Sequence, residues 1–415
     1  MSVKRLFSFA EQYFLRRSLP HGIVSLQYLL PDPPPKVRIH RRLWVMNRPS
    51  RIPLLLFLLI ELFLWLRWVT FSGWLRSWYA VKHRGAAISE GEGTGKAAQL
   101  KKILCTSLCH CIPPAEVYAF GLYRPARRQE MWNYVFTHEL PAFHHWRNVR
   151  RGGHQESSDL LQDKFSSTRL LGGQGVPTAP VMGLVSRNGP FDPAPYLHGC
   201  PRIFCKPRHG SGSRDAFVIE ARDNGEGAAI FAVKSGIKAQ PSAYEDLQKA
   251  MTKDDFLIQP FMDNHPVLAA LCPAGDAVTV RLITEVHPLH GATFYCATLE
   301  IPDASDGAGY YHIILPVELS SGLVMRFPDR RLPAFVQARH DAFCARMGRI
   351  VVPFWEEIKD SAMKAHRCFP DVYAVAWDYV VTADGPYILE GNTGWGTTTP
   401  QVLHGGLLQD EDRED

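Results

Sequence analysis

The stretch AVAWDYVVTADGPYILEGNTGWGTTT, residues 374–399, determines how the rest of the chain is interpreted. Two apolar runs, 373–381 and 387–389, flank the tripeptide Asp384-Gly385-Pro386. A short connection that contains glycine is typical of a tight turn between two strands. The stretch therefore predicts a β-hairpin.

Three side chains with hard oxygen atoms, Asp378, Glu390 and Asn392, lie on this hairpin. A three-residue loop pairs Ala383 with Tyr387 and places Asp378 opposite Asn392, with Glu390 diagonal to it on the same face. A two-residue loop would send Asp378 to the other face. Carboxylates beside a buried apolar run need a partner or a metal. Mg²⁺ prefers such oxygens and normally arrives with nucleotide phosphates.

A second polar segment lies upstream, in RIFCKPRHGSGSRDAFVIE. Residues 203–206 and 216–220 are strand-like, and residues 209–214 form a glycine-containing loop between them. Backbone N–H groups of such a loop can close around a phosphate, and Lys206 adds a positive charge beside it. Taken alone, such a segment is more often a surface hairpin, but the carboxylates downstream favour a phosphate site.

Five segments in order, DKFSSTRLL, FCKPRHGSGSRD, FLIQPFMDNHPVLAAL, AVTVRLIT and AWDYVVTADGPYILEGNT, resemble the ATP-grasp superfamily. The closest resemblance is to its sugar-transfer-associated, α-L-glutamate-ligase-related branch, and it covers roughly residues 160–406. It implies an α+β fold in which two subdomains clamp ATP. It also implies activation of a carboxylate as an acyl phosphate, which an amine or related nucleophile then captures.

The same resemblance assigns roles to residues at the matching positions. It implies catalytic roles for Arg281 and Lys206, nucleotide contacts from Lys164, Lys206, Gly210, Ser211, Gly212, Ser213, Arg214, Gln259 and Phe261, and Mg²⁺ coordination by Asp378, Glu390 and Asn392. The glycine-rich loop departs from the family pattern, since Ser213, Arg214 and Asp215 replace its second, glycine-rich half. Each assignment has a structural alternative: Asp378 and Glu390 as a surface ion-pair face, Lys206 as a solvated lysine, and Arg281 as the polar side of an alternating strand.

Composition sets limits on the class of protein. A chain of 415 residues can hold two or three domains, and a formal net charge of +5 without an interleaved basic surface argues against nucleic-acid binding. Nine scattered cysteines indicate reduced thiols in the cytoplasm. Cys105, Cys109 and Cys111 could ligate a metal, but buried helix cysteines are the preferred interpretation.

The N-terminal region contains IPLLLFLLIELFLWLRWVTFSGWL, residues 52–75, which is apolar enough to cross a bilayer. It lies too far from Met1 to be a cleaved signal peptide. Basic residues both precede and follow it, and a single crossing would export the ATP-using domain. We therefore expect residues 52–78 to contact the cytoplasmic face of the membrane as a helix or helical hairpin. The alternative is a buried helix of a helical domain.

These observations predict four regions: a membrane-associated region (1–85), a helical region with flexible joins at 86–95 and 150–158 (86–158), an ATP-grasp domain (159–408) and an acidic tail (409–415). The predicted function is an ATP- and Mg²⁺-dependent ligase. It would join a small carboxylate donor to an amine or hydroxyl acceptor, such as a sugar-linked or envelope precursor, at the inner face of the membrane. The alternatives are an inactive nucleotide-binding scaffold and a sugar or lipid kinase.

Overall fold

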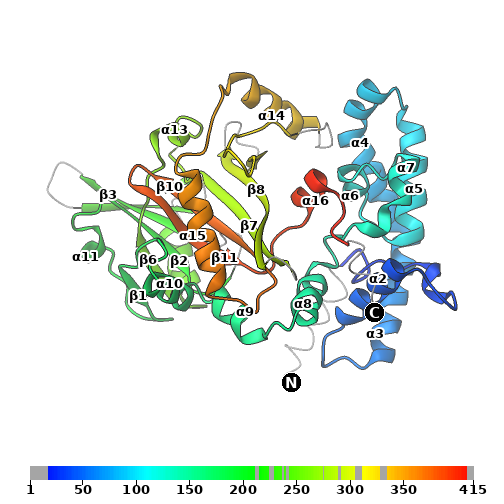
Figure 1. The fold of residues 1–415 in the computed structure, drawn as a ribbon, viewed down its shortest axis with the longest axis horizontal. Coiled ribbons are helices and arrows are strands. Elements are labelled where there is room, and N and C mark those ends of the chain that lie inside the picture. Colours follow the sequence, from blue (N-terminus) through cyan, green and yellow to red (C-terminus); the bar gives the residue numbers. More distant parts are fainter. Residues whose placement is uncertain are drawn as a thin grey trace. The chain divides into compact units, whose positions relative to one another are not determined.

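The computed structural model describes residues 17–210, 215–223, 229–235, 238–239, 243–273, 275–287, 291–303, 311–327 and 334–408. The chain divides into two compact units (Figure 1). The first combines Met1–Arg147, Pro328–Arg346 and Gly396–Asp415, and the second combines Asn148–Phe327 and Met347–Trp395. The predicted acidic tail, 409–415, lies outside the described residues.

The second unit contains two antiparallel sheets. One has six strands in the order β1-β6-β2-β3-β4-β5 and the other has five in the order β11-β10-β7-β8-β9. The strands are β1 (Gly183–Val185), β2 (Arg202–Pro207), β3 (Phe217–Asp223), β4 (Ala229–Ser235), β5 (Lys238–Ala239), β6 (Phe256–Pro260), β7 (Thr279–His287), β8 (Gly291–Asp303), β9 (Tyr311–Pro316), β10 (Ala374–Thr382) and β11 (Gly385–Asn392). The helices are α9 (Gln155–Gln162), α10 (Lys164–Gly173), α11 (Ala194–Leu197), α12 (Ala243–Met251), α13 (Pro266–Ala269) and α15 (Trp355–Arg367).

Helix α15 covers one face of the five-stranded sheet (Figure 1). Its buried residues, among them Ile358, Ala362 and Ala365, recur at helical spacing, and acidic and basic residues lie at the ends that suit the helix dipole. The Ser361 hydroxyl lies 2.9 Å from the Tyr379 hydroxyl. Because side chains alternate along β10, Tyr379 faces α15 and Asp378 faces the opposite side of the sheet.

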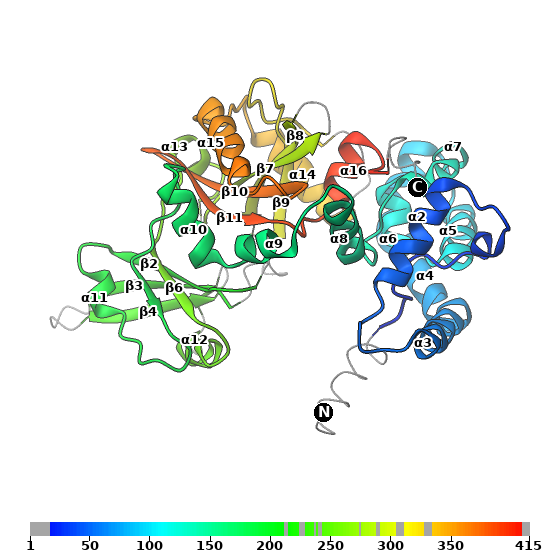
Figure 2. The same cartoon turned by 60° about the horizontal axis from the view of Figure 1, so that its bottom comes forward.

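A helix also packs on one face of the six-stranded sheet (Figure 2). Ile203 and Cys205 of β2 belong to an apolar cluster with Leu247 and Ala250 of α12. Lys206, the next residue along β2, therefore projects from the other face of the strand.

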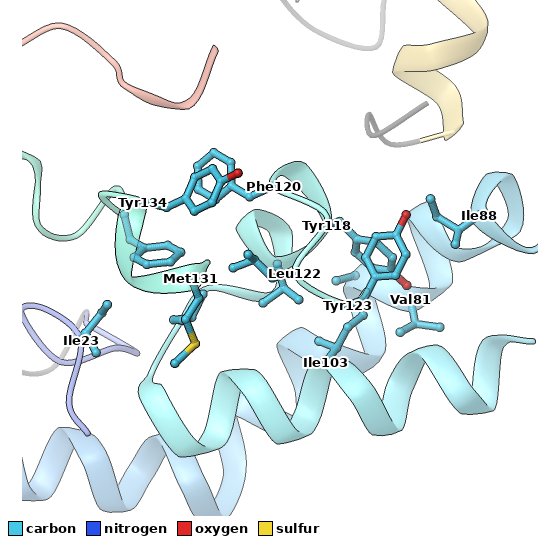
Figure 3. Close-up of a cluster of buried hydrophobic side chains, with 14 of the residues drawn as sticks. Ile23, Val81, Ile88, Ile103, Tyr118, Phe120, Leu122, Tyr123, Met131 and Tyr134 are labelled. Carbon is cyan, nitrogen blue, oxygen red and sulfur yellow. The ribbon is translucent and has the colours of Figure 1, made fainter. Parts of the chain in front are cut away.

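The first unit is helical. Its described elements are η2 (Leu26–Leu29), α2 (Pro35–Met46), α3 (Leu54–Arg67), the π-helical turn η3 (Trp68–Ser72), α4 (Gly73–Glu92), α5 (Lys96–His110), α6 (Pro114–Ala119), α7 (Pro125–Gln129), η4 (Met131–Asn133), α8 (Leu140–Arg150, which continues into the second unit), α14 (Ala334–Arg346) and α16 (Thr398–His404). Its core gathers Ile103 of α5, Tyr118 of α6, and Phe120, Leu122 and Tyr134 from the segments between helices (Figure 3).

The linker predicted at 86–95 is wrong over most of its length, because α4 continues to Glu92. Small residues let α4 and α5 approach closely: a Cβ added to Gly85 would lie 3.1 Å from Oε1 of Gln99. The buried Gln99 amide donates to the carbonyl oxygens of Gly85 and Thr94. This close packing lies at Gly85, just before the predicted linker, because a Cβ added to Gly91, Gly93 or Gly95 would meet no atom within 4 Å. The second predicted join, 150–158, is shorter than expected because α9 begins at Gln155.

The cysteine prediction also needs correction. Cys111 is buried, whereas Cys105 and Cys109 are exposed on α5. No group of three or more His, Cys, Asp or Glu side chains that could hold a metal is found within the described ranges.

The apolar segment 52–75 forms α3, η3 and the start of α4, and one side of it is buried while the other is exposed. Among the described residues, Leu54–Ala86 is the helix that is long and apolar enough to cross a membrane by length and composition. Glu61 is buried, and its carboxylate accepts hydrogen bonds from the backbone N–H of His21 at 3.0 Å and from Nε1 of Trp44. The exposed large apolar residues are Leu54, Leu55, Leu56, Leu58, Leu59, Leu62, Leu66, Phe63, Phe71, Trp74, Leu75, Trp78 and Tyr79.

The C-terminal segment forms part of the helical unit. Gln401 of α16 is buried; its Oε1 accepts from the backbone N–H of Val135, and its Nε2 donates to the carbonyl of the same residue, both at 2.7 Å. The backbone N–H of Leu408 donates to the carbonyl of Asn133 at 3.0 Å. Residues 396–408 are therefore part of the helical unit, although most of that unit lies more than 200 residues earlier in the sequence.

Gln401→Ala should lower the free energy of unfolding by about 2–4 kcal/mol, because the buried N–H and C=O of Val135 lose their partner. Urea denaturation monitored by circular dichroism measures this change. Gln155→Ala, which removes an exposed amide on α9, is the matched control and should cost under about 1 kcal/mol. Equal effects of the two substitutions would show that the Gln401 contacts do not hold the C-terminal segment in place.

Candidate active site

The predicted hairpin is confirmed, and of the two loop lengths considered it has the two-residue one. Thr382 pairs with Gly385, so the loop has two residues, and Asp378 pairs with Glu390 instead of Asn392. The register shifts between Asp378 and Tyr379, and Leu389 is the extra residue of a β-bulge. A two-residue loop alone would turn Asp378 away, but the bulge restores it to the face of Glu390.

The three predicted metal ligands meet at one point on that face. Nδ2 of Asn392 lies 3.1 Å from an oxygen of Asp378 and 3.1 Å from an oxygen of Glu390. An amide NH₂ group, which carries partial positive charge, thus bridges the two carboxylates. The two carboxylates suit a hard divalent cation such as Mg²⁺, and the Asn392 amide would join them as a ligand by turning its oxygen toward the same point.

Two lysines approach this triad from other elements. Nζ of Lys206 donates to the carbonyl of Leu389, the bulge residue, at 3.1 Å. Nζ of Lys164 lies 3.7 Å from Oε2 of Glu390 and donates to the carbonyl of Gly210. A cavity of about 120 Å³ is lined by Lys164, Phe204, Lys206, Pro207, Gly210, Ala216, Thr279, Asp378, Leu389 and Glu390.

The position of Lys164 follows from local structure. Asp163 caps α10 by accepting from the backbone N–H groups of Phe165 and Ser166, so Lys164 is the first residue of that helix. Arg208 donates to both carboxylate oxygens of Asp163 at 2.8 and 2.6 Å, and also reaches Asp255 at 3.3 Å. These contacts tie the start of α10 to the end of β2, which carries Lys206.

Arg281 lies beside the triad. Its Nε and Nη2 donate to the two oxygens of Asp378 at 2.7 and 3.0 Å, and its Nη1 lies 2.8 Å from Oε1 of Glu300. The guanidinium of Arg281 on β7 thus lies between two carboxylates carried by the strands on either side, β10 and β8. Glu300 is absent from the sequence-based predictions; the alternation of Thr298 and Glu300 with Ala297 and Leu299 on β8 was the available signal.

Burial and neighbouring charges shift the pKa values of these groups. Burial lowers the pKa of Lys206 to about 8, against the attraction of Glu390. Burial raises the pKa of Asp378 to about 6, against the effect of Arg281. Burial alone would raise the pKa of Glu390, but Lys206 and Lys164 lower it overall. Burial raises the pKa of Glu300 despite Arg281. Strongly perturbed groups around one cavity are typical of a functional site.

The other predicted residues lie elsewhere or outside the described residues. The Gln259 side chain is buried, and its Nε2 donates to the carbonyl of Ala179 at 3.0 Å. The guanidinium carbon of Arg202 lies over the ring of Phe261, 4.1 Å from the centroid of that ring. Ser211, Gly212, Ser213 and Arg214 fall outside the described residues.

The family model for sugar-transfer associated ATP-grasp proteins matches residues 149–413. The chain belongs to the sugar-transfer associated ATP-grasp family. Membership confirms the predicted fold class and supports ATP-dependent ligation as the general class of reaction. A comparison with curated proteins gives no match.

Solved ATP-grasp structures are distant from the chain. The ligase PsnB in complex with its minimal precursor is 13% identical, with a TM-score of 0.33 over 59% of this chain and 56% of PsnB. D-alanine–D-alanine ligase from Bacillus anthracis with ATP is 11% identical, with a TM-score of 0.34 over 59% of each chain. D-alanyl-alanine synthetase A from Vibrio cholerae is 12% identical, with a TM-score of 0.40 over 63% of this chain and 64% of that protein. The chain thus spans about three-fifths of the length of these structures.

The affinity for ATP should fall as the pH rises through about 8, because Lys206 loses the proton that gives it a positive charge. The expected loss between pH 7 and pH 9 is up to about tenfold. Isothermal titration of the protein with ATP at a series of pH values measures it. Lys206→Met should bind ATP more weakly at pH 7 and show no loss above pH 8. A wild-type affinity that is constant from pH 7 to pH 9 would contradict the assignment of Lys206 to the phosphates.

Proposed function

We propose that the chain is an ATP-dependent carboxylate–amine ligase that works through an acyl phosphate. The observation that carries the proposal is the convergence of Lys164, Lys206, Asp378 and Glu390 around one cavity. They come from α10, β2, β10 and β11. Positive and negative side chains in one cluster suit a ligand that combines anionic phosphates with a bound metal cation.

The two lysines would hold the phosphates of ATP. Buried Lys206 acts at short range in a low-dielectric setting, where its charge is poorly screened by water. Asp378, Glu390 and Asn392 would hold Mg²⁺, which supplies charge neutralisation between phosphate oxygens during phosphoryl transfer.

Arg281 would position the donor carboxylate and stabilise negative charge on the transferred phosphoryl group. Its planar fork suits an anion whose charge is spread over several oxygens. Glu300 and Asp378 hold the guanidinium from two sides, so the side chain is oriented before substrate arrives. Such preorganisation avoids an entropy loss at the moment of reaction.

Two alternatives predict different observations. An inactive scaffold would bind ATP without turnover; the altered loop at Ser213 and Arg214 favours it, whereas the convergence of both lysines with both carboxylates argues against a decayed site. A sugar or lipid kinase would release a phosphorylated product in place of an acylated one.

The acceptor is proposed to be an amine or hydroxyl on a sugar-linked or envelope precursor, handled at the inner face of the membrane. The family description and the exposed apolar residues of 52–78 support this location. The ligase would then act where such precursors are assembled.

Glu390→Gln should lower Mg²⁺-dependent ADP release at least a hundredfold, because the triad loses a charged ligand. ADP release is measured with mixtures of amino acids as donors and of amino sugars and envelope precursors as acceptors. Glu357→Gln, an exposed glutamate of α15, is the matched control and should release ADP at the wild-type rate. Mass spectrometry of the product identifies an amide or ester for the ligase and a phosphate ester for the kinase.

ATP binding without ADP release under every substrate mixture would support the scaffold and contradict the ligase. ADP release that Glu390→Gln leaves unchanged would show that turnover does not use the triad.

A further inference from the structure

We infer that the continuous helix α3-η3-α4 lies lengthwise in one leaflet of an anionic bilayer, and holds the helical unit on the membrane without crossing it. This inference rests on the proposed membrane location and specifies its geometry. It does not depend on the ligase chemistry.

The exposed side of this helix is apolar over a long distance. Eight of the 14 residues of α3 are exposed leucine or phenylalanine, and Leu55 is 72% and Phe71 of η3 62% exposed. Between Leu54 and Leu75, Thr70 is the exposed polar residue. An apolar surface of this extent is typical of an interaction site.

Two polar groups on this side are satisfied within the helix itself. The Thr70 hydroxyl donates to the carbonyl of Leu66 at 2.7 Å, and Nε1 of Trp74 donates to the carbonyl of Val69 at 2.9 Å. The acid of the segment, Glu61, is buried on the opposite side. Internal satisfaction of polar groups is what a hydrocarbon environment requires, because lipid tails offer no hydrogen bonds.

Charge favours an anionic bilayer over a second copy of the chain. Exposed Arg51 precedes the helix, and exposed Arg76 and Lys82 lie on α4, where the apolar stretch ends. The Lys82 ammonium lies 5.3 Å from the centroid of the Trp78 ring, in the arrangement of aromatic and basic residues found at membrane interfaces. In contact with a second copy, these basic residues would need acidic partners, and the apolar face carries none.

Packing on the other side of the helix excludes a spanning orientation. Phe57 packs on Trp44 of α2 at 5.9 Å between ring centroids, Trp68 donates to the carbonyl of Ser107 of α5, and Gln99 of α5 meets Gly85. Protein thus covers one side of the helix from its first turns to beyond residue 80, and this cover includes the exposed Lys101 on α5. A spanning helix would carry that cover into the hydrocarbon.

Flotation of the full chain with vesicles tests the surface. The chain should float with phosphatidylglycerol/phosphatidylethanolamine vesicles, and at least tenfold less with pure phosphatidylcholine. Leu55→Lys/Leu59→Lys should reduce binding to the anionic vesicles at least tenfold. Leu160→Lys, at an exposed leucine of α9, is the matched control and should bind as the wild type does. Equal flotation of all three proteins, or a soluble dimer that the double substitution dissociates, would overturn the inference.

Thiol labelling of vesicle-bound protein tests the orientation. Cys105 and Cys109 are exposed on α5. A membrane-impermeant maleimide added outside the vesicles should label both at rates within twofold of the free protein, as read by peptide mass spectrometry. Protection of more than tenfold would show that α5 enters the bilayer. ADP release by the double variant in solution reports separately on the ligase proposal.

Discussion

One β-bulge determines the geometry of the candidate active site. With its two-residue loop, the β10–β11 hairpin would carry Asp378 and Glu390 on opposite faces. The extra residue, Leu389, brings the two carboxylates to the same face, and its carbonyl accepts from Nζ of Lys206. The bulge therefore both assembles the acidic pair and binds the lysine that faces it.

The charges around the cavity stabilise one another. Half-buried Glu390 stays ionised because Lys206 and Lys164 are close, and buried Asp378 is held by the guanidinium of Arg281. Removing one member of such a group leaves another buried charge without compensation, which costs several kcal/mol. A bound cation would add positive charge beside the carboxylates, and a bound phosphate would add negative charge beside the lysines. The stability of the ligand-free protein therefore depends on the same charged groups that the proposed reaction needs.

Much of this arrangement could be predicted from the sequence, because it follows from residue types in a fixed order. The hairpin and the strand that bears Lys206 are local patterns. The register was not predictable, because the bulge residue is an ordinary leucine and only the pairing with β10 reveals it. Glu300 was missed for a similar reason: alternation along β8 places it on the polar face, but only the pairing of β7 with β8 brings it to Arg281. The linker prediction at 86–95 was wrong because small and polar residues signal a linker by composition, whereas α4 continues through them to Glu92.

The most direct test of the account is a crystal structure with ADP and Mn²⁺, using the anomalous signal of manganese to locate the metal. The account predicts a metal peak about 2.1 Å from oxygens of Asp378 and Glu390, with the β-phosphate beside Lys206. Metal and nucleotide bound at a different surface, with Arg281 still bridging Asp378 and Glu300, would contradict it.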